Sequence, residues 1–337
     1  MEARFKKTAI IGSGAWGTAL ALTAAQNGDP VVIWTYRETE AAIIRETRHS
    51  LSPVKGAMPL PDNVTVTSDW ADVAGADLVI VVVPSVVMRS VAQSLSEAKL
   101  ADNAVVVTCS KGIEKDTNLL MSQIISEYLS CPVGALSGPN HAEDIVLGLP
   151  SLTLVGFDDI AIASAVQKRL NAPFLRIYTS TDIVSMQLGG ALKNVYALAS
   201  GIVAGLGLGD NARAALATRG LAEMTRLGMA CGGRMETFMG LSGMGDLVVT
   251  CYSEHSRNLT AGRLLASGVP AKECQARIGQ VVEGIPNTFS AYQLARKLQV
   301  RTPLIDAMYD ILYNGKPARE ALRELMNRDL REESLSE

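Results

Sequence analysis

The sequence predicts an α/β protein in which a doubly wound parallel sheet is followed by an all-α domain. In the first half, short runs of apolar, β-branched residues alternate with longer helical patterns. In the second half, Ala, Leu, Gly and Met recur at helical spacing and strand-like runs are almost absent. The 337 residues suffice for two domains that each bury a core.

The predicted strands are near-continuous apolar runs without alternation. Runs of this kind are typical of a parallel sheet that helices cover on both faces. They span Thr8–Gly12, Val31–Thr35, Leu78–Val83, Ala104–Cys109, Val133–Ser137 and Ser151–Val155. Helical patterns lie between several of them, for example at Gly17–Asn27 and Ser85–Leu95, and this is the rhythm of a doubly wound sheet.

Near Asp182 the alternation of strand and helix patterns ends, and a series of helical patterns begins. These patterns span Ile183–Ser200, Asn211–Leu227, Asn258–Ala266, Thr288–Leu298 and Arg319–Arg328. We therefore expect a first domain over residues 1–185 and a helical second domain over residues 186–337.

Composition excludes several function classes. A content of 48% hydrophobic and 19% charged residues with a net charge of -3 gives no reason to expect a nucleic-acid partner. The five cysteines form no Cys-x-x-Cys pair and the three histidines have no metal-ligand spacing, so we expect neither disulfides nor a metal. No apolar run is long enough for a signal peptide or a membrane span, and we expect a cytoplasmic protein.

The first predicted strand ends in the run Gly12-Ser13-Gly14-Ala15-Trp16-Gly17, which also opens a predicted helix. In this context the glycine spacing indicates a dinucleotide-binding loop of the Rossmann type. The first glycine permits the tight turn, the second lets the backbone approach a pyrophosphate, and the third lets the helix pack on the strand. The pyrophosphate then lies on free N–H groups at the helix N-terminus. The alternative is a glycine-rich turn without a ligand.

The second strand is followed by Tyr36 and Arg37, and no acid occurs there before Glu38. A site selective for NAD usually has Asp or Glu at this place to hold the ribose hydroxyls, whereas an arginine can meet a 2′-phosphate. We therefore favour NADPH over NADH, although NADH stays possible. The alternative is that Arg37 is a solvated surface charge.

Polar segments follow two of the later strands, on the side where ligands bind in such sheets. These segments are Ser110-Lys111-Gly112 and Ser137–Glu143. Lys193 lies within a largely apolar helix, and Gly189 and Ala197 line the same face one turn away. A lysine with so little bulk around it can approach a substrate closely, and burial would lower its pKa toward a value useful for proton transfer. A lysine that snorkels to the surface is the alternative.

A second polar run begins at Asp246, which lies in a glycine-flanked turn where it can approach an ammonium group such as that of Lys193. Further along, Ser256, Arg257 and Asn258 immediately precede a helical pattern. Together the arginine and the helix N-terminus make a phosphate site.

Taken together these runs resemble the bacterial NAD(P)-dependent glycerol-3-phosphate dehydrogenase family over nearly the whole chain. The matching runs are Gly12–Leu20, Val83–Ser85, Lys111-Gly112, Ser137–Pro139, Gln187–Val195, Asn211–Arg213, Thr218–Met224, Gly245–Leu247, Ser256–Asn258 and Gly279–Gly284. Two places depart from the common pattern: Asn140-His141 replaces a small hydroxylated residue and Phe, and Val86 replaces a polar residue.

The resemblance implies reduction of dihydroxyacetone phosphate to sn-glycerol 3-phosphate for glycerophospholipid synthesis, by a cytosolic homodimer. It implies that Lys193 is the general acid/base and that Asp246 orients it. The implied substrate contacts are Lys111, Gly138, Asn140, Asp246, Ser256, Arg257 and Asn258. The implied cofactor contacts beyond the glycine loop and Arg37 are Trp16, Tyr36, Lys111, Ala142, Arg257, Val281 and Glu283.

Two other functions fit the same broad pattern. One is a related dehydrogenase that acts on a β-hydroxy acid or 2-keto acid, whose carboxylate would not need the Ser256-Arg257-Asn258 run. The other is a sensor that binds NADP(H) without turnover, against which the pairing of Lys193 with Asp246 argues.

Overall fold

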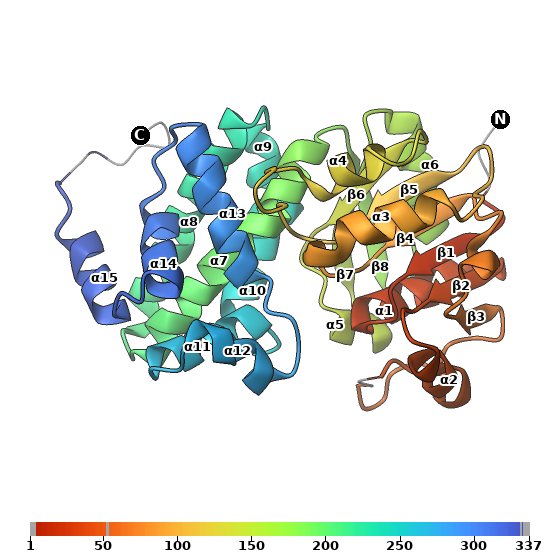
Figure 1. Ribbon diagram of the computed structural model, residues 1–337, viewed down its shortest axis with the longest axis horizontal. Coiled ribbons are helices and arrows are strands. Elements are labelled where there is room, and N and C mark those ends of the chain that lie inside the picture. Colours follow the sequence, from red (N-terminus) through yellow and green to blue (C-terminus); the bar gives the residue numbers. More distant parts are fainter. Residues whose placement is uncertain (1–4, 52–53, 331, 333–337) are drawn as a thin grey trace. The chain divides into compact units, whose positions relative to one another are not determined.

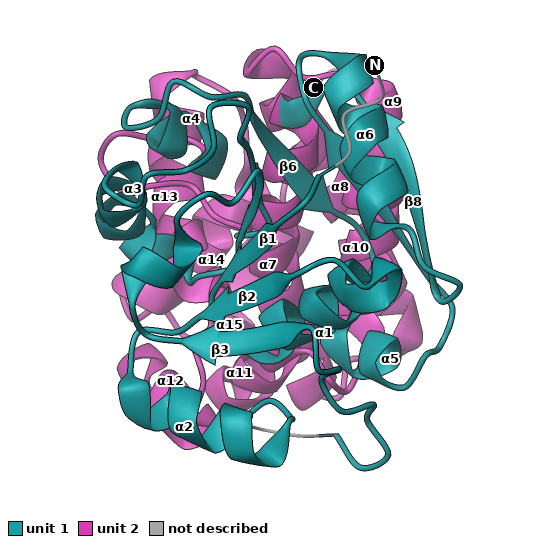
Figure 2. Ribbon diagram, turned by 90° about the vertical axis from the view of Figure 1, so that its right-hand side faces the viewer, with its two compact units in different colours: residues 1–110, 121–183 teal, residues 111–120, 184–337 magenta. Residues whose placement is uncertain are grey.

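A computed structural model describes residues 5–51, 54–330 and 332, which form two compact units. The first unit comprises residues 1–110 and 121–183, and the second comprises residues 111–120 and 184–337 (Figure 2). The predicted division at residue 185 left the segment 111–120 in the first domain, whereas in the structure this segment packs with the second unit.

The first unit is an eight-stranded sheet in the order β3-β2-β1-β4-β5-β6-β7-β8 (Figure 1). The strands are β1 Thr8–Ile11, β2 Val31–Trp34, β3 Val64–Thr67, β4 Leu78–Val81, β5 Val105–Thr108, β6 Val133–Ser137, β7 Ser151–Gly156 and β8 Leu175–Ser180. Strands β1 to β6 run parallel, and the strand order reverses between β1 and β4, where a doubly wound sheet binds its ligand.

The far edge of this sheet departs from the prediction of a wholly parallel sheet. Strand β7 pairs antiparallel with β6, and β8 then runs parallel to β7. Strands β3 and β8 were not predicted, because exposed residues interrupt both, so neither is the continuous apolar run used as the criterion. All six predicted strands are present, and each begins and ends within two residues of its predicted bounds.

Helices cover both faces of the sheet, as Figure 1 shows. They are α1 Ala15–Ala24, α2 Glu38–Thr47, α3 Met88–Ser96, α4 Met121–Ser126, α5 Ala142–Val146 and α6 Ile160–Leu170, with short helical turns η1 Ala25–Asn27, η2 Trp70–Val73 and η3 Ser85–Val87. Helix α1 packs with α5 and α6, and α3 packs with α4. The core between these layers consists of the strand residues and the apolar faces of the helices.

The second unit is built from helices around its own apolar core. They are α7 Ile183–Gly205, α8 Gly209–Ala230, α9 Met235–Phe238, α10 Asp246–Tyr252, α11 Arg257–Ala266, α12 Ala271–Ile278, α13 Gly284–Lys297, α14 Pro303–Tyr313 and α15 Ala318–Met326, with the π-helical turn η4 Leu241–Gly245. Helix α7 is buried along most of its 23 residues, so the other helices pack around it. No helix in the described part of the chain is both long and apolar enough to cross a bilayer.

Candidate active site

The turn between β1 and α1 has the geometry that the glycine spacing predicts. Gly12 has a φ of +124°, and a Cβ there would lie 2.5 Å from the carbonyl oxygen of Val82. A Cβ on Gly17 would collide with the carbonyl oxygen of Gly12, so the helix can start this close to the strand only with glycine at both places.

The start of α1 fits the pyrophosphate of a dinucleotide. The N-cap residue is Gly14, so no side chain caps the first N–H groups of this ten-residue helix. A Cβ on Gly14 would meet nothing within 4 Å, which leaves open space directly beside the loop. Unpaired N–H groups at a helix N-terminus beside such a space favour an anionic group. Ala15 and Trp16 form the first turn of the helix at this place.

The end of β2 carries a short hydrogen-bonded chain. The Ser13 hydroxyl donates to Thr35 Oγ1 at 2.8 Å, and the Thr35 hydroxyl donates to Glu40 at 2.8 Å. Arg37 reaches the same carboxylate at 3.4 Å and its side chain is 68% exposed, while Tyr36 is 82% exposed. Arg37 and Tyr36 are thus presented to solvent beside the loop, and Glu40, which sequence analysis did not weigh, is engaged by Thr35.

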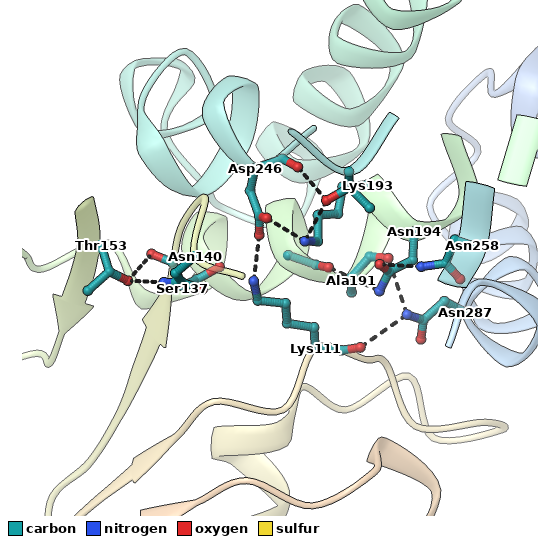
Figure 3. A network of polar contacts seen from close by, with 12 residues as sticks. Lys111, Ser137, Asn140, Thr153, Ala191, Lys193, Asn194, Asp246, Asn258 and Asn287 are labelled. Atoms are coloured by element: carbon teal, nitrogen blue, oxygen red, sulfur yellow. Dashed lines mark hydrogen bonds and ion pairs between the residues drawn. The ribbon is translucent and has the colours of Figure 1, made fainter. Parts of the chain in front are cut away.

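The loop after β6 holds the predicted residues Gly138 and Asn140. The Asn140 amide donates to Thr153 Oγ1 at 2.6 Å, and the Thr153 hydroxyl donates to the carbonyl oxygen of Ser137 at 3.2 Å (Figure 3). A Cβ on Gly138 would lie 3.0 Å from the backbone of Thr153. The unusual Asn140 therefore ties this loop to β7, and Ala142 begins helix α5 directly after it.

Three charged side chains meet in the second unit, around the carboxylate of Asp246. Lys193, on α7, bonds to Oδ1 of Asp246, and Lys111 bonds to Oδ2 at 2.7 Å (Figure 3). The Lys193 ammonium also donates to the hydroxyl of Thr250 at 2.8 Å, and that hydroxyl donates to the carbonyl oxygen of Asp246 at 2.6 Å. Only 7% of Lys193 and 1% of Asp246 are exposed, so Lys193 does not snorkel to the surface.

The small residues around Lys193 explain how Asp246 comes so close. A Cβ on Gly189, one turn before Lys193, would lie 2.5 Å from the carbonyl oxygen of Ser242. Glycine there lets the turn η4 rest directly on α7, and Asp246 follows η4 as the first residue of α10. The predicted approach of Asp246 to Lys193 is confirmed, and Gly189 is its structural cause.

Burial and charge set the protonation of this cluster. The pKa of Lys193 is lowered to about 7. Burial is the largest cause, the Asp246 carboxylate acts in the opposite direction, and the ammonium of Lys111 lowers the pKa further. Burial alone would raise the pKa of Asp246, but the ammonium groups of Lys111 and Lys193 hold it below its usual value. Asp246 is therefore ionised at neutral pH, and Lys193 is poised to release its proton.

Buried amides join the neighbouring helices. The Asn258 amide donates to Asn194 Oδ1 at 2.9 Å and accepts from the backbone N–H of Gly284 at 2.9 Å. The Asn194 amide donates to the carbonyl oxygen of Gly190 at 3.3 Å, and Asn287 donates to the carbonyl oxygens of Lys111 and Ala191. This network fixes the starts of α11 and α13 against α7.

The start of α11 holds the predicted phosphate residues. Ser256 is its N-cap, and its hydroxyl accepts from the backbone N–H of Leu259 at 3.2 Å. Arg257 is exposed at the first helical position and donates to the carbonyl oxygen of Val281 at 3.1 Å. Glu283 stands at the N-cap of α13, two residues further along. Arg257, Val281 and Glu283 thus lie in one region of the second unit.

The described residues contain no group of three His, Cys, Asp or Glu side chains that could hold a metal ion.

Two family models cover almost the whole chain. The N-terminal model of NAD-dependent glycerol-3-phosphate dehydrogenase matches residues 7–163, and the C-terminal model of the same enzyme matches residues 182–323. The chain belongs to the NAD-dependent glycerol-3-phosphate dehydrogenase family.

Curated members of this family match at nearly full length. The glycerol-3-phosphate dehydrogenase [NAD(P)+] of Syntrophotalea carbinolica is 44% identical, over 96% of this chain and 98% of its own. The protein of the same name from Pediococcus pentosaceus is 43% identical, over 97% and 99%. The crystal structure of glycerol-3-phosphate dehydrogenase from Coxiella burnetii is similar at a TM-score of 0.91 and 34% identity, and the alignment covers 96% of this chain and 99% of that one.

Three residues of the site were not predicted from the sequence. Thr250 lies one turn after Asp246 on the same helix, and that spacing could have revealed it. Asn194 directly follows Lys193 in the sequence, and its position next to the lysine was not interpreted as part of the site. Asn287 lies 96 residues from Ala191 and 176 from Lys111, and no local pattern distinguishes it.

Proposed function

We propose that this protein reduces dihydroxyacetone phosphate to sn-glycerol 3-phosphate, which feeds glycerophospholipid synthesis, with a reduced nicotinamide dinucleotide as cofactor. Membership of the family supports this, and one observation in the site carries it: a single buried carboxylate, Asp246, holds the ammonium groups of Lys111 and Lys193. With both lysines charged, the cluster has a net charge of plus one. A buried positive site stabilises the negative charge that develops on a carbonyl oxygen during reduction.

Lys193 is the proton donor in this proposal. Its ammonium has three N–H donors, of which one bonds to Asp246 and one to Thr250. The third N–H is available to the carbonyl oxygen of the substrate. A reduced nicotinamide dinucleotide, when bound, would supply a hydride to the carbonyl carbon. As the C=O bond becomes a C–O bond, Lys193 gives its proton to the oxygen, becomes a neutral amine and recovers a proton from solvent.

Asp246 and Thr250 keep Lys193 in place through this step. Asp246 stays ionised because two cations lower its pKa, and its attraction offsets part of the burial cost of the Lys193 ammonium. The Thr250 hydroxyl is itself oriented by the carbonyl oxygen of Asp246, so it presents a lone pair to Lys193. A fixed ammonium needs no reorganisation when the alkoxide forms.

The phosphate of the substrate is assigned to the start of α11. Arg257 carries five N–H donors, of which one is engaged by Val281. The guanidinium and the positive end of the ten-residue helix favour a doubly charged phosphate. Ser256 and Asn258 shape this helix start, while Lys111, Gly138 and Asn140 complete the proposed set of substrate contacts.

The cofactor is assigned to the loop from Gly12 to Gly17 of the first unit. The further cofactor contacts that the family resemblance implies are Tyr36, Lys111, Ala142, Arg257, Val281 and Glu283. We propose a preference for NADPH over NADH. Arg37 is exposed, and its partner Glu40 lies at 3.4 Å, so its guanidinium can turn to a 2′-phosphate. The resemblance to the family further supports a cytoplasmic homodimer, which size-exclusion chromatography with light scattering would test.

The decisive experiment mixes the purified protein with NADPH and dihydroxyacetone phosphate and follows the loss of reduced-nicotinamide absorbance. Oxidation of the cofactor that requires dihydroxyacetone phosphate is the expected result, and a repeat with NADH measures the cofactor preference. NADPH binding without turnover would refute the proposed reaction. In that case 2-keto acids and β-keto acids are the next substrates, and a protein that turns over neither class is an NADP(H) sensor.

A further inference from the structure

The segment 111–120 is held by the helical unit, although β5 and α4 of the first unit flank it in sequence. Its residues Ile113 and Leu120 pair in an isolated antiparallel bridge and are buried in the core of the second unit. Its tip is held by α13, because the backbone N–H of Asp116 donates to Gln293 Oε1 at 3.2 Å and Gln293 Nε2 donates to Asp116 Oδ1 at 3.3 Å. Helix α13 therefore holds the tip of this segment, whereas Lys111 lies at its base.

One side chain of α13 contacts the base of the segment directly. Asn287 is fully buried, and its Nδ2 donates to the carbonyl oxygen of Lys111 at 3.1 Å and to that of Ala191 at 3.2 Å (Figure 3). Ala191 lies on α7, two residues before Lys193. A single amide group thus joins the two stretches of backbone that carry Lys111 and Lys193.

The chemistry of this contact requires an amide. Two carbonyl oxygens need two hydrogens, and an NH₂ group supplies both, whereas a hydroxyl supplies one. The acceptor of the same side chain, Asn287 Oδ1, has no hydrogen-bond partner among the described residues. A buried acceptor without a partner destabilises the folded state. The two N–H donors of Asn287, and not its acceptor, therefore account for the contribution of this residue to the structure.

We propose that Asn287 is a positioning residue that ties the backbone of Lys111 to α7, so that the ammonium groups of Lys111 and Lys193 meet Asp246 together. The assignment of the lysines to catalysis rests on the proposed function, but the tie between the two backbones does not. Without the amide, Lys111 keeps its long, flexible side chain and loses the anchor of its backbone. Its ammonium then moves toward solvent, and Lys193 keeps only Asp246 and Thr250 as partners.

This loss has a measurable electrostatic consequence. The charged or titratable groups that face Lys193 are Asp246, Lys111 and Cys251, and burial raises the pKa of Cys251 to about 12, so that thiol is neutral. Lys111 is then the only one of these groups that lowers the pKa of Lys193 by its charge. Displacing Lys111 must raise the pKa of Lys193.

The first test measures the pKa of Lys193 in the absence of substrate. Protein with ¹³Cε-labelled lysine is titrated by NMR, and Lys193→Met identifies the Lys193 signal. We expect Asn287→Ala to raise the Lys193 midpoint by about one pH unit, and Lys111→Met to raise it similarly. The double variant should show no further rise. An unchanged midpoint in Asn287→Ala, or an equal additional rise in the Lys111→Met background, overturns the proposal.

Matched controls separate positioning from a general loss of structure. Gln293→Ala loosens the same segment at its tip and should leave the Lys193 midpoint unchanged. If Asn287→Ala does not fold, Asn287→Ser keeps one donor and should give a smaller rise in the midpoint. Thermal unfolding and circular dichroism show that each titrated variant is folded.

The second test is a double-mutant cycle in turnover. We expect Asn287→Ala to lower kcat/KM for dihydroxyacetone phosphate about tenfold in the wild-type background and less than about twofold in the Lys111→Met background. Equal factors in both backgrounds contradict a role through Lys111. A wild-type protein that does not reduce dihydroxyacetone phosphate refutes the proposed function instead, and the NMR titration then decides the positioning role by itself.

Discussion

Removing the charge of Lys111 should move the pH dependence of the reaction upward. Lys111→Met keeps the length of the side chain and deletes its ammonium, which bonds to Asp246 at 2.7 Å and lowers the pKa of Lys193. Reduction needs Lys193 protonated, so the rate is constant below the pKa of Lys193 and falls above it. In the wild type this fall is expected near pH 7, where that pKa lies.

The size of the shift follows from Coulomb's law. Two like charges about 4 Å apart at an effective dielectric constant of about 20 repel by about 4 kcal/mol. Since one pKa unit corresponds to about 1.4 kcal/mol, the upper bound is about three units. The Lys111 side chain is 20% exposed, so solvent screens part of this repulsion. We expect a rise of about one unit after that reduction.

The assay is kcat/KM for dihydroxyacetone phosphate against pH at saturating NADPH, for wild type, Lys111→Met and Lys115→Met. Lys115 lies in the same segment with its ammonium 4.9 Å from the ring centre of Phe289, away from Asp246. Ionisation of the substrate phosphate is common to all three proteins and cancels in the comparison. A falling limb at the same pH in wild type and Lys111→Met, or an equal shift in Lys115→Met, would refute the electrostatic account.

Four further predictions concern the proposed site and the packing around it. Lys193→Ala should lower kcat by about 10²–10⁴-fold, the usual contribution of a positioned proton donor, and leave NADPH binding unchanged by fluorescence titration; near-normal turnover would contradict the assignment. Arg257→Ala should raise the KM for dihydroxyacetone phosphate at least tenfold through the lost charge-assisted bonds, and unchanged KM values for both ligands would exclude the phosphate role. Arg37→Gln should raise the KM for NADPH several-fold and leave that for NADH unchanged, whereas parallel changes in both would remove Arg37 from the 2′-phosphate site. Gly189→Val should destabilise the protein by about 1–3 kcal/mol in urea unfolding, because its side chain overlaps the backbone of Ser242; an unchanged midpoint would mean that η4 does not need its close contact with α7.

Local features of the fold and the site were predictable from sequence because neighbouring residues determine them. The glycine loop is such a case, since the strand, the turn and the helix that define it are contiguous. The approach of Asp246 to Lys193 was also predictable, because a helix lined by small residues and a glycine-rich turn both favour close backbone contact. The first of these inferences required the pattern of one segment. The second required two segments, each with a clear pattern of its own.

Features that depend on distant segments were not predictable in the same way. Lys111 lies 135 residues from Asp246, and only the folded chain brings them together. The direction of β7 was missed because a buried strand has the same composition whether it runs parallel or antiparallel to its neighbour. Strands β3 and β8 were missed because exposed residues alternate in them, as is common for strands near the edge of a sheet.

The assignment of residues 111–120 to the helical unit limits how this protein can be divided or recombined. A fragment that begins at residue 184 lacks Ile113 and Leu120 from its core and Lys111 from beside Asp246. A chimera that joins the dinucleotide-binding unit of one relative to the helical unit of another must therefore exchange two stretches of chain together. The ten residues 111–120 have to come from the same parent as α13, because their anchors Asn287 and Gln293 lie there. We therefore expect substitutions in residues 111–120 and substitutions in α13 to occur together among related proteins.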